Sequence, residues 1–449
     1  RQVGLRSRGM TEVMASVVLS PDVPEDVKQA LRPCYVLGFL HFHARIDVVQ
    51  VREALRDRIL QLPRFACAAR ADSKGRVTWE RLHSIDMEEV VIEKFDIKTQ
   101  DDVDNFCGQV YQDGIGEGGD MPWWKAYICN DQADGRHLLM LAINHAIGDG
   151  PTLVSTLLAI LDDQANPPKT VSRRKMAPPS CFAKLGAVCG ALCNVLVKDQ
   201  LPGDKKSCLK VANHRRPGGN VAVGQSDQID LDRVKEVAAL YPGATVNDIL
   251  MSVVTLAVQS YLAKTEPAAL ERNKSFRAFF PVSVRRKGGD NPFTEDNFGN
   301  VFGSGVLFLP IGEKDPNKIV ANIKAQIDTI KISPEPWLRF KITNMLSRSG
   351  LSMLTIWNLV ADMYGKVTVA LSNVVGPSEP AYLCGQKVEA ISFYALAPIG
   401  FYIGVVSYCG KISCGFVLRK ECESDASRMT CTWTPAFETL AAAARAQKR

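Results

Sequence analysis

A histidine, an aspartate and two glycines lie close together in residues 143–150, which read INHAIGDG. A neutral imidazole can take a proton from a hydroxyl group near physiological pH, provided that its ring is held in one orientation. His145 is therefore a candidate general base. Asp149 could hold the turn by accepting backbone hydrogen bonds or by pairing with an arginine, and Gly148 and Gly150 allow close approaches that a side chain prevents.

The rest of the sequence offers few competing catalytic patterns. It contains no GxSxG nucleophile elbow, no HExxH zinc helix and no GxxxxGK[ST] phosphate loop. Of the six histidines, only His145 is closely followed by Gly-Asp-Gly. Taken alone, the HxxxDG pattern also fits a histidine that caps a strand and an ordinary Asp-Gly turn, so the surrounding sequence has to decide between the two interpretations.

The composition is that of a globular protein. With 449 residues, 46% hydrophobic and 23% charged, the chain is long enough for two or three domains with large cores. Its net charge of +6 comes from interleaved basic and acidic residues, so we expect no nucleic-acid partner. A mildly basic face could still attract an anionic cofactor or a lipid headgroup.

Thirteen cysteines are scattered without CxxC pairs or zinc-ligand spacing, which indicates reduced thiols in a reducing compartment. Cys189 and Cys193 lie one helical turn apart in an apolar stretch, but a metal site would need two further ligands nearby. We therefore favour core packing for this pair and expect no metal site.

Alternating strand and helix patterns must position His145. In the first half they predict strands at 35–44, 76–82, 89–95, 123–130 and 136–145, and helices at 47–62 and 101–114. The last strand ends at the histidine. A further helix follows from Pro151, which suits a first helical turn because its missing N–H needs no partner there.

A change of composition separates two halves. After residue 162, clusters of Pro, Gly and charge flank an apolar run, Phe182–Val197, which favours a crossover connection. The run is shorter than the ~20 residues of a spanning helix, and it fits either a helix lying on a membrane surface or a helix packed between domains. We expect an N-terminal half at 1–165, a linker at 166–224 and a C-terminal half at 225–449.

The second half shows the same alternation without a strict sequence repeat of the first. It predicts a helix at 245–264 and strands around 275–284, 300–311, 366–375, 387–393, 400–410 and 411–419. Two similarly built α/β halves are therefore expected.

The motif NHAIGDG resembles the HHxxxDG motif of the coenzyme A-dependent acyltransferase superfamily, and further motifs resemble its wax ester synthase/diacylglycerol acyltransferase family, particularly eukaryotic members. The resemblance covers about residues 20 to 425. Its motifs are PRF at 63–65, PWW at 122–124, VNDIL at 246–250, FPVSVR at 280–285, FGNVFG at 298–303, LSNVVGP at 371–377 and VVSYCGKISCGF at 405–416.

Two positions depart from the family pattern. Asn144 replaces the first histidine of HHxxxDG, which resembles the eukaryotic variant and keeps the second, catalytic histidine. Pro122 and Trp124 keep the Pro-Leu-Trp element, but Trp123 replaces its leucine and could reshape the acceptor tunnel. The DFGWG element of plant BAHD acyltransferases is missing, which argues against that branch.

The resemblance implies an α/β (α+β) fold with two chloramphenicol acetyltransferase-like halves, forming a pseudo-dimer around a central tunnel. It implies that His145 deprotonates a fatty alcohol or a diacylglycerol, whose oxygen attacks the acyl-CoA thioester directly. The products would be wax esters or triacylglycerols. No acyl-enzyme, permanently bound cofactor or metal is needed, because acyl-CoA is a co-substrate.

The resemblance also assigns roles around the motif residues His145, Asp149 and Gly150. A donor must stabilise the charge on the carbonyl oxygen, and Asn373, with Ser372 beside it, is the candidate. We expect Asp149 to pair with Arg285.

Two further pairs of motif residues have more than one interpretation. Asn247 and Asp248 match a motif that matters for activity in the family, but they also fit a helix N-cap and first turn. Trp123 and Trp124 fit a tunnel wall or a core better than a chemical role.

Substrates dissolved in membranes imply peripheral association with the cytosolic face of the endoplasmic reticulum; cytoplasmic and lipid-droplet locations are the alternatives. The chain begins at Arg1, and we see no secretory leader. Two alternative functions stay open: a condensation-type acyltransferase that uses a carrier-bound acyl donor, and a catalytically silent lipid- or acyl-CoA-binding protein. A monomer would suffice, and a homo-oligomer remains possible.

Overall fold

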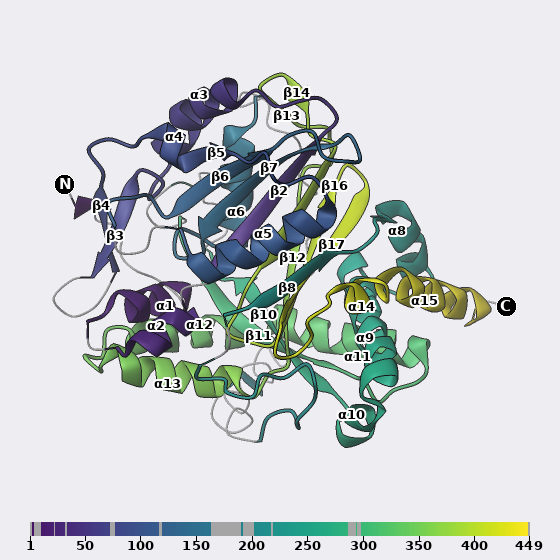
Figure 1. Ribbon diagram of the computed structural model, residues 1–449. Helices are drawn as coiled ribbons and strands as arrows, with labels where there is room; N and C mark the ends of the chain where they lie inside the picture. Colours follow the sequence, from purple (N-terminus) through teal and green to yellow (C-terminus); the bar gives the residue numbers. More distant parts are fainter. Residues whose placement is uncertain are drawn as a thin grey trace.

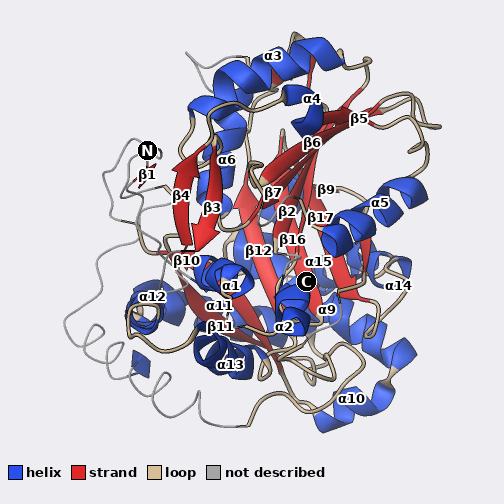
Figure 2. Cartoon of the chain, turned by 60° about the vertical axis from the view of Figure 1, so that its left-hand side comes forward, coloured by secondary structure: helices blue, strands red, loops and turns tan. Residues whose placement is uncertain are grey.

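The computed structural model describes residues 2–3, 10–21, 23–31, 34–71, 77–115, 119–162, 190–191, 202–216, 219–285, 293 and 298–447. Its two main sheets form the interior, and most helices surround them (Figures 1 and 2). The predicted apolar run Phe182–Val197 lies outside the described residues, except for positions 190–191.

The first sheet has the strand order β15-β2-β7-β6-β5. Its strands are β15 (Ala390–Ala395), β2 (Tyr35–Phe42), β7 (His137–Asn144), β6 (Trp124–Cys129) and β5 (Val91–Glu93). The second sheet has the order β11-β10-β12-β16-β17-β8, and β9 also pairs with β17. Its strands are β8 (Val221–Gln225), β9 (Ile229–Asp230), β10 (Phe276–Ser283), β11 (Phe302–Leu309), β12 (Val369–Val375), β16 (Phe401–Tyr408) and β17 (Lys411–Arg419).

Two smaller sheets and the helices complete the described part. The small sheets join β1 (Gln2–Val3), β4 (Val77–Arg81) and β3 (Cys67–Ala71), and β13 (Tyr382–Leu383) and β14 (Gln386–Lys387). The α-helices are α1 (Met10–Leu19), α2 (Glu25–Leu31), α3 (Val48–Arg58), α4 (Met87–Val90), α5 (Gln100–Asp113), α6 (Gly150–Ile160), α8 (Leu231–Ala239), α9 (Val246–Thr265), α10 (Pro267–Arg272), α11 (Pro316–Ile332), α12 (Glu335–Leu346), α13 (Met353–Tyr364), α14 (Ser427–Thr430) and α15 (Trp433–Gln447), and a 3-10 turn follows α3 at Ile59–Gln61.

The strand that carries the histidine motif lies in the middle of the first sheet. Every residue of β7 is buried, since α5 covers one face of the sheet and α3 packs on the other. Strands β2 and β7 pair antiparallel from Tyr35 opposite Asn144 to Phe42 opposite His137. A fully paired central strand gives a rigid support for the residues at its end.

Strand β15 comes from the second half of the chain but pairs with β2 of the first sheet. Its Phe393 packs against β16 and β17 where Gly404 and Gly415 lie opposite each other. A Cβ atom at Gly415 would lie 2.3 Å from the Phe393 carbonyl oxygen, so this close approach requires glycine. The two halves are thus joined by an exchanged strand, which the sequence patterns did not predict.

The second half begins earlier than the predicted boundary of 225. Strand β8 starts at residue 221 and pairs with β17, so it belongs to the second sheet rather than to the predicted linker at 166–224. The sequence just before this strand is rich in Gly and Pro, and this composition indicated a linker. The short strand β8 was therefore not predicted, because its stability depends on pairing with the distant β17.

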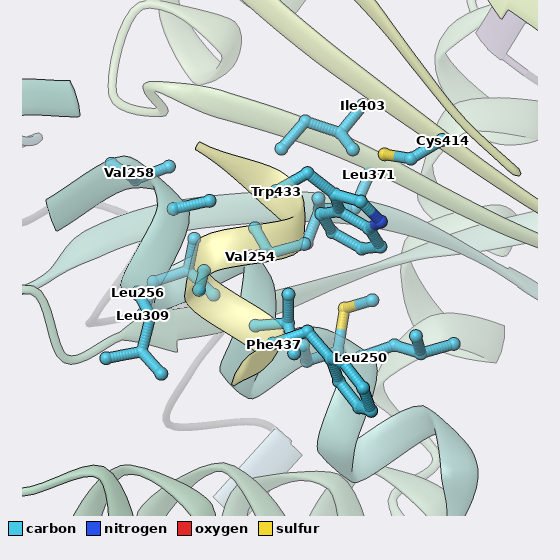
Figure 3. Close-up of a cluster of buried hydrophobic side chains, with 14 of the residues drawn as sticks. Leu250, Val254, Leu256, Val258, Leu309, Leu371, Ile403, Cys414, Trp433 and Phe437 are labelled. Carbon is cyan, nitrogen blue, oxygen red and sulfur yellow. The ribbon is translucent and has the colours of Figure 1, made fainter. Parts of the chain in front are cut away.

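A large apolar core lies behind the second sheet (Figure 3). Helix α9 contributes Leu250 and Val254, and α15 contributes Trp433 and Phe437. Among the described residues, α9 is the one helix long and apolar enough to cross a membrane, but most of its length is buried in this core. Its composition is therefore explained by core packing.

Candidate active site

His145 lies directly after β7, in the turn that leads into α6. Its backbone N–H donates to the Cys34 carbonyl at 2.8 Å. The Asn144 side chain accepts from Ala146 N at 2.9 Å, and the Ile147 N–H donates to the Asn144 carbonyl at 3.0 Å. The asparagine that replaces the first motif histidine therefore shapes the turn through a local side-chain hydrogen bond.

The His145 imidazole contacts the second half of the chain. Its Nδ1 lies 3.2 Å from Oδ1 of Asn300, which is fully buried. The Asn300 amide donates to the carbonyl oxygens of His145, at 2.9 Å, and Ala146, at 3.3 Å. The Phe302 ring packs near the imidazole, with 6.5 Å between ring centroids. One buried asparagine thus holds both the ring and the backbone of the candidate base.

Burial lowers the pKa of His145 below its usual value of 6.5, and this effect is partly offset by hydrogen bonding to its own backbone, by the nearby Asp149 charge and by the hydrogen bond with Asn300. The side chain nevertheless keeps partial exposure. A neutral imidazole at pH 7 is the protonation state that a general base requires.

Asp149 is buried and caps α6 by accepting from Thr152 N at 3.2 Å. The guanidinium of Arg285, after β10, binds both carboxylate oxygens at 2.6 and 2.7 Å. The Val301 N–H donates to the same carboxylate at 3.0 Å. The predicted pairing of Asp149 with Arg285 is confirmed, and it ties the two halves together beside the histidine.

Arg64, in the PRF motif, is a further buried residue that reaches the histidine turn. Its guanidinium donates to the Ala146 carbonyl at 2.8 Å and lies over the rings of Trp79 and Phe298. The contact of Arg64 with the histidine turn was not predicted, because PRF entered only as a motif of the family resemblance. Arg64 lies between Pro63 and Phe65 in the sequence. An arginine between apolar residues could have indicated a structural role, because a buried arginine needs hydrogen-bond or ionic partners.

The glycines of the motif have different roles. A Cβ atom at Gly148 would lie 2.5 Å from Cγ2 of Thr152, so the turn requires glycine there. At Gly150 the nearest atom to such a Cβ would be Cγ2 of Val374, at 3.7 Å, which is an ordinary contact. The expected steric need for glycine therefore holds at Gly148 and not at Gly150.

Asn373, the candidate oxyanion donor, donates to Oδ1 of Asn247 at 2.9 Å. Ser372 beside it hydrogen-bonds the Tyr402 hydroxyl instead. Within the described part of the chain, no hydrogen bond joins Asn373 or Ser372 to His145. The structure thus brings together two motif asparagines, one from β12 and one from the first turn of α9.

The N-cap of α9 is Thr245, and Asn247 and Asp248 lie in the first turn of the helix, as the alternative interpretation of this motif expected. The Thr245 side chain accepts from Asp248 N, and the Asp248 carboxylate accepts from Thr245 N at 2.7 Å. This reciprocal capping box explains the aspartate by local structure. The side chain of Asn247 is left to bind Asn373.

The PWW element lies in the first core. Trp123 and Trp124 are fully buried, and Pro122 is buried beside them. Trp124 donates to the Phe65 carbonyl at 2.8 Å, and the Trp123 ring packs edge-on against Trp79. Of the two expectations for these tryptophans, tunnel wall or core, the structure supports core.

No group of three His, Cys, Asp or Glu side chains among the residues described is arranged to hold a metal ion.

Sequence comparisons identify the family. Residues 298–441 match the family described as the WS/DGAT C-terminal domain. Wax ester synthase/diacylglycerol acyltransferase 3 of Arabidopsis thaliana is 22% identical over 415 residues, 84% of this chain and 84% of the relative. A probable diacylglycerol O-acyltransferase of Mycobacterium tuberculosis is 26% identical over 329 residues, 66% and 68% of the two chains. The chain is thus similar to the wax ester synthase/diacylglycerol acyltransferase family over most of its length, and its residues 298–441 match that family's C-terminal domain.

Members of this family are acyltransferases, so the chain is an enzyme of that class. Solved structures confirm the fold. The wax ester synthase/diacylglycerol acyltransferase from Marinobacter aquaeolei VT8 is 18% identical with a TM-score of 0.63, covering 94% of this chain and 98% of that one. A condensation domain of the CDA synthetase is 13% identical with a TM-score of 0.60, covering 97% and 96%. The predicted two-half α/β architecture of the acyltransferase is therefore correct.

Proposed function

We propose that this acyltransferase transfers a fatty acyl group from acyl-CoA to a long-chain alcohol, a diacylglycerol, or both. The observation that carries the proposal is the position of His145: a partly exposed imidazole with a lowered pKa, held at the junction of the two halves. The names of the plant and mycobacterial relatives support the alcohol and diacylglycerol acceptors. Acyl-CoA is a co-substrate in this proposal, and no permanently bound cofactor takes part.

In the proposed reaction, His145 takes the proton from the acceptor hydroxyl while its oxygen attacks the thioester carbonyl carbon. The carbon–sulfur bond then breaks, and the leaving CoA sulfur takes the proton from the imidazolium. No acyl-enzyme forms, so no nucleophilic side chain is needed. A general base of this kind contributes about 10²- to 10⁴-fold to the rate.

Charge that develops on the carbonyl oxygen needs a fixed donor, and Asn373 is the proposed one. Asn247 takes one of its amide protons at 2.9 Å and holds the amide plane, which leaves the second proton for the oxyanion. We assign Asp149, Arg285 and Gly150 to the framework of the turn and not to the chemistry.

Product analysis tests this function. The purified chain is incubated with palmitoyl-CoA and either hexadecanol or dioleoylglycerol, and the lipids are resolved by mass spectrometry. We expect palmityl palmitate, a triacylglycerol, or both, and an unchanged protein mass after incubation with palmitoyl-CoA alone. Absence of both esters would contradict the proposed substrates, and a protein heavier by one palmitoyl group would contradict direct attack.

We also propose that the enzyme works as a peripheral protein on the cytosolic face of the endoplasmic reticulum. Its proposed acceptors are dissolved in membranes, and the apolar run Phe182–Val197 has basic flanks suited to anionic headgroups. Vesicle flotation of the full chain and of a variant lacking residues 182–197 tests this. Equal flotation of the two folded proteins would overturn the role of the run.

A further inference from the structure

We infer that Asn300 is a positioning residue that fixes the tautomer of His145, so that Nε2 carries the lone pair that accepts the substrate proton. The inference rests on the proposed role of His145 as the base. It concerns a residue of the FGNVFG motif, from the half of the chain that does not carry the histidine.

The hydrogen-bond pattern determines which way the Asn300 amide points. Its Nδ2 lies 2.9 Å from the His145 carbonyl oxygen and 3.3 Å from the Ala146 carbonyl oxygen. Carbonyl oxygens only accept, so the NH₂ group must face them. The opposite orientation would place Oδ1 against two carbonyl oxygens, which is repulsive. The Asn300 carbonyl oxygen therefore faces the imidazole.

The same reasoning then fixes the imidazole. Oδ1 of Asn300 can only accept, and it lies 3.2 Å from Nδ1 of His145. Nδ1 must carry a proton to make this hydrogen bond, and in the neutral ring Nε2 is then unprotonated. The ring also hydrogen-bonds its own backbone, and Asn300 adds an acceptor from the second half that favours the tautomer with its base at Nε2.

Among the described residues, no carboxylate accepts a hydrogen bond from Nδ1 of His145. The Asp149 carboxylate, the nearest acid of the motif, is bound by Arg285, Thr152 and the Val301 N–H. The hydrogen bond with the neutral Asn300 amide orients the ring and raises the His145 pKa, but burial outweighs this effect, so the pKa stays below its usual value. The charged groups around the turn are Asp149, Arg285 and Arg64, whose guanidinium binds the Ala146 carbonyl.

The position of Asn300 links this tautomer to the docking of the two halves. Asn300 is fully buried, and its side chain spans from the strand-end turn of the first sheet to the loop before β11. Buried polar networks whose members are all satisfied hold a single geometry. Only when the halves are correctly docked does the imidazole receive the Asn300 acceptor.

Nuclear magnetic resonance of the full chain with ¹⁵N-labelled histidine tests the inference without reference to activity. Long-range ¹H–¹⁵N spectra at pH 7.5 distinguish the two tautomers, and a His145→Gln spectrum assigns the signals. We expect His145 to be protonated at Nδ1 in the unmodified protein. A His145 ring protonated at Nε2 would overturn the inference, and the tautomer is read in the unmodified protein.

Asn300→Ala provides the kinetic arm. We expect kcat to fall about 10- to 100-fold with KM for palmitoyl-CoA changed by less than about threefold, together with a larger fraction of His145 protonated at Nε2 than in the unmodified protein. Asn273→Ala is the matched control, because Asn273 is equally an internal asparagine that bridges backbone groups, accepting from Lys205 N and donating to the Ala269 carbonyl. It should change neither the tautomer nor kcat.

The outcomes separate this inference from the proposed function. An Asn300→Ala protein that keeps full kcat and the Nδ1-protonated tautomer would overturn the positioning role. Full activity in His145→Ala would overturn the proposed function, whatever the tautomer in the unmodified protein. Asn300→Asp gives a third readout, because a carboxylate on Nδ1 should move the acid limb of the kcat/KM profile to higher pH by about one unit.

Discussion

The Asp149 carboxylate and the Arg285 guanidinium form a two-point ion pair across the junction between the halves, at 2.6 and 2.7 Å. Asp149 begins α6 in the first half, and Arg285 follows β10 in the second. Both side chains are largely buried, at 2% and 16% exposure. The aspartate of the motif is therefore a structural link, and the histidine four residues earlier is left to do the chemistry.

Removing one partner of this pair should destabilise the protein strongly. We expect Asp149→Asn to lower the free energy of unfolding by about 3 to 5 kcal/mol, since it breaks a largely buried two-point ion pair. Urea unfolding measures this. Asp131→Asn is the matched control, because Asp131 pairs with Arg45 at the surface and should contribute less than about 1 kcal/mol. Equal losses in the two variants would contradict a special role for the buried pair.

The lowered pKa of His145 predicts the pH dependence of activity. A base works only when deprotonated, so kcat/KM should rise with pH through the histidine pKa and level off above it. Because burial holds that pKa below 6.5, the half-maximal point should lie below pH 6.5 and activity should be constant near pH 7. Initial rates of CoA release between pH 5 and 8 provide the measurement. A midpoint above pH 7 would contradict a buried, neutral base.

Much of the fold could be predicted from local sequence signals. The helix expected at 47–62 is α3, and Asp47 caps it as the pattern indicated. The strand expected at 136–145 is β7, and Pro151 lies in the first turn of α6. What local patterns could not predict is pairing between distant segments, such as β15 joining β2 of the other half.

In the candidate site, too, contacts between distant segments could not be predicted from local sequence patterns. The motif contained His145 and Asp149, and the ion pair with Arg285 was expected from the family resemblance. Asn300 and Arg64 were present in quoted motifs, but their contacts with the histidine turn depend on how the halves dock. Thr245 was missed as the cap of α9 because Asn247 and Asp248 are also residue types that begin helices.

Asn373 and Asn247 should have unequal effects on catalysis. If Asn373 donates to the oxyanion, Asn373→Ala should lower kcat about 10²- to 10³-fold with little change in KM. Asn247→Ala should have a smaller effect of the same kind, because Asn247 acts by holding the Asn373 amide. Steady-state kinetics with palmitoyl-CoA distinguishes the two. A larger loss in Asn247→Ala than in Asn373→Ala would reverse the assigned roles.

Gly148 tests the steric requirement of the turn. In Gly148→Ala the added methyl group would lie 2.5 Å from Cγ2 of Thr152, so we expect the free energy of unfolding to fall by about 1 to 3 kcal/mol. Gly38→Ala in β2 is the control, because no atom lies within 4 Å of its added methyl group. Denaturant unfolding measures the free energy of unfolding of both variants. A Gly148→Ala protein as stable as Gly38→Ala would contradict the tight turn.

The most direct test compares the unmodified chain with His145→Ala in one assay, following CoA release from palmitoyl-CoA with hexadecanol and with dioleoylglycerol. Palmitoyl-CoA affinity is measured in parallel, so that loss of catalysis is separated from loss of binding. We predict ester formation by the unmodified chain and a loss of about 10²- to 10⁴-fold in kcat for the variant, with acyl-CoA affinity retained. A His145→Ala protein that forms ester at more than about one tenth of the unmodified rate would contradict general-base catalysis by His145.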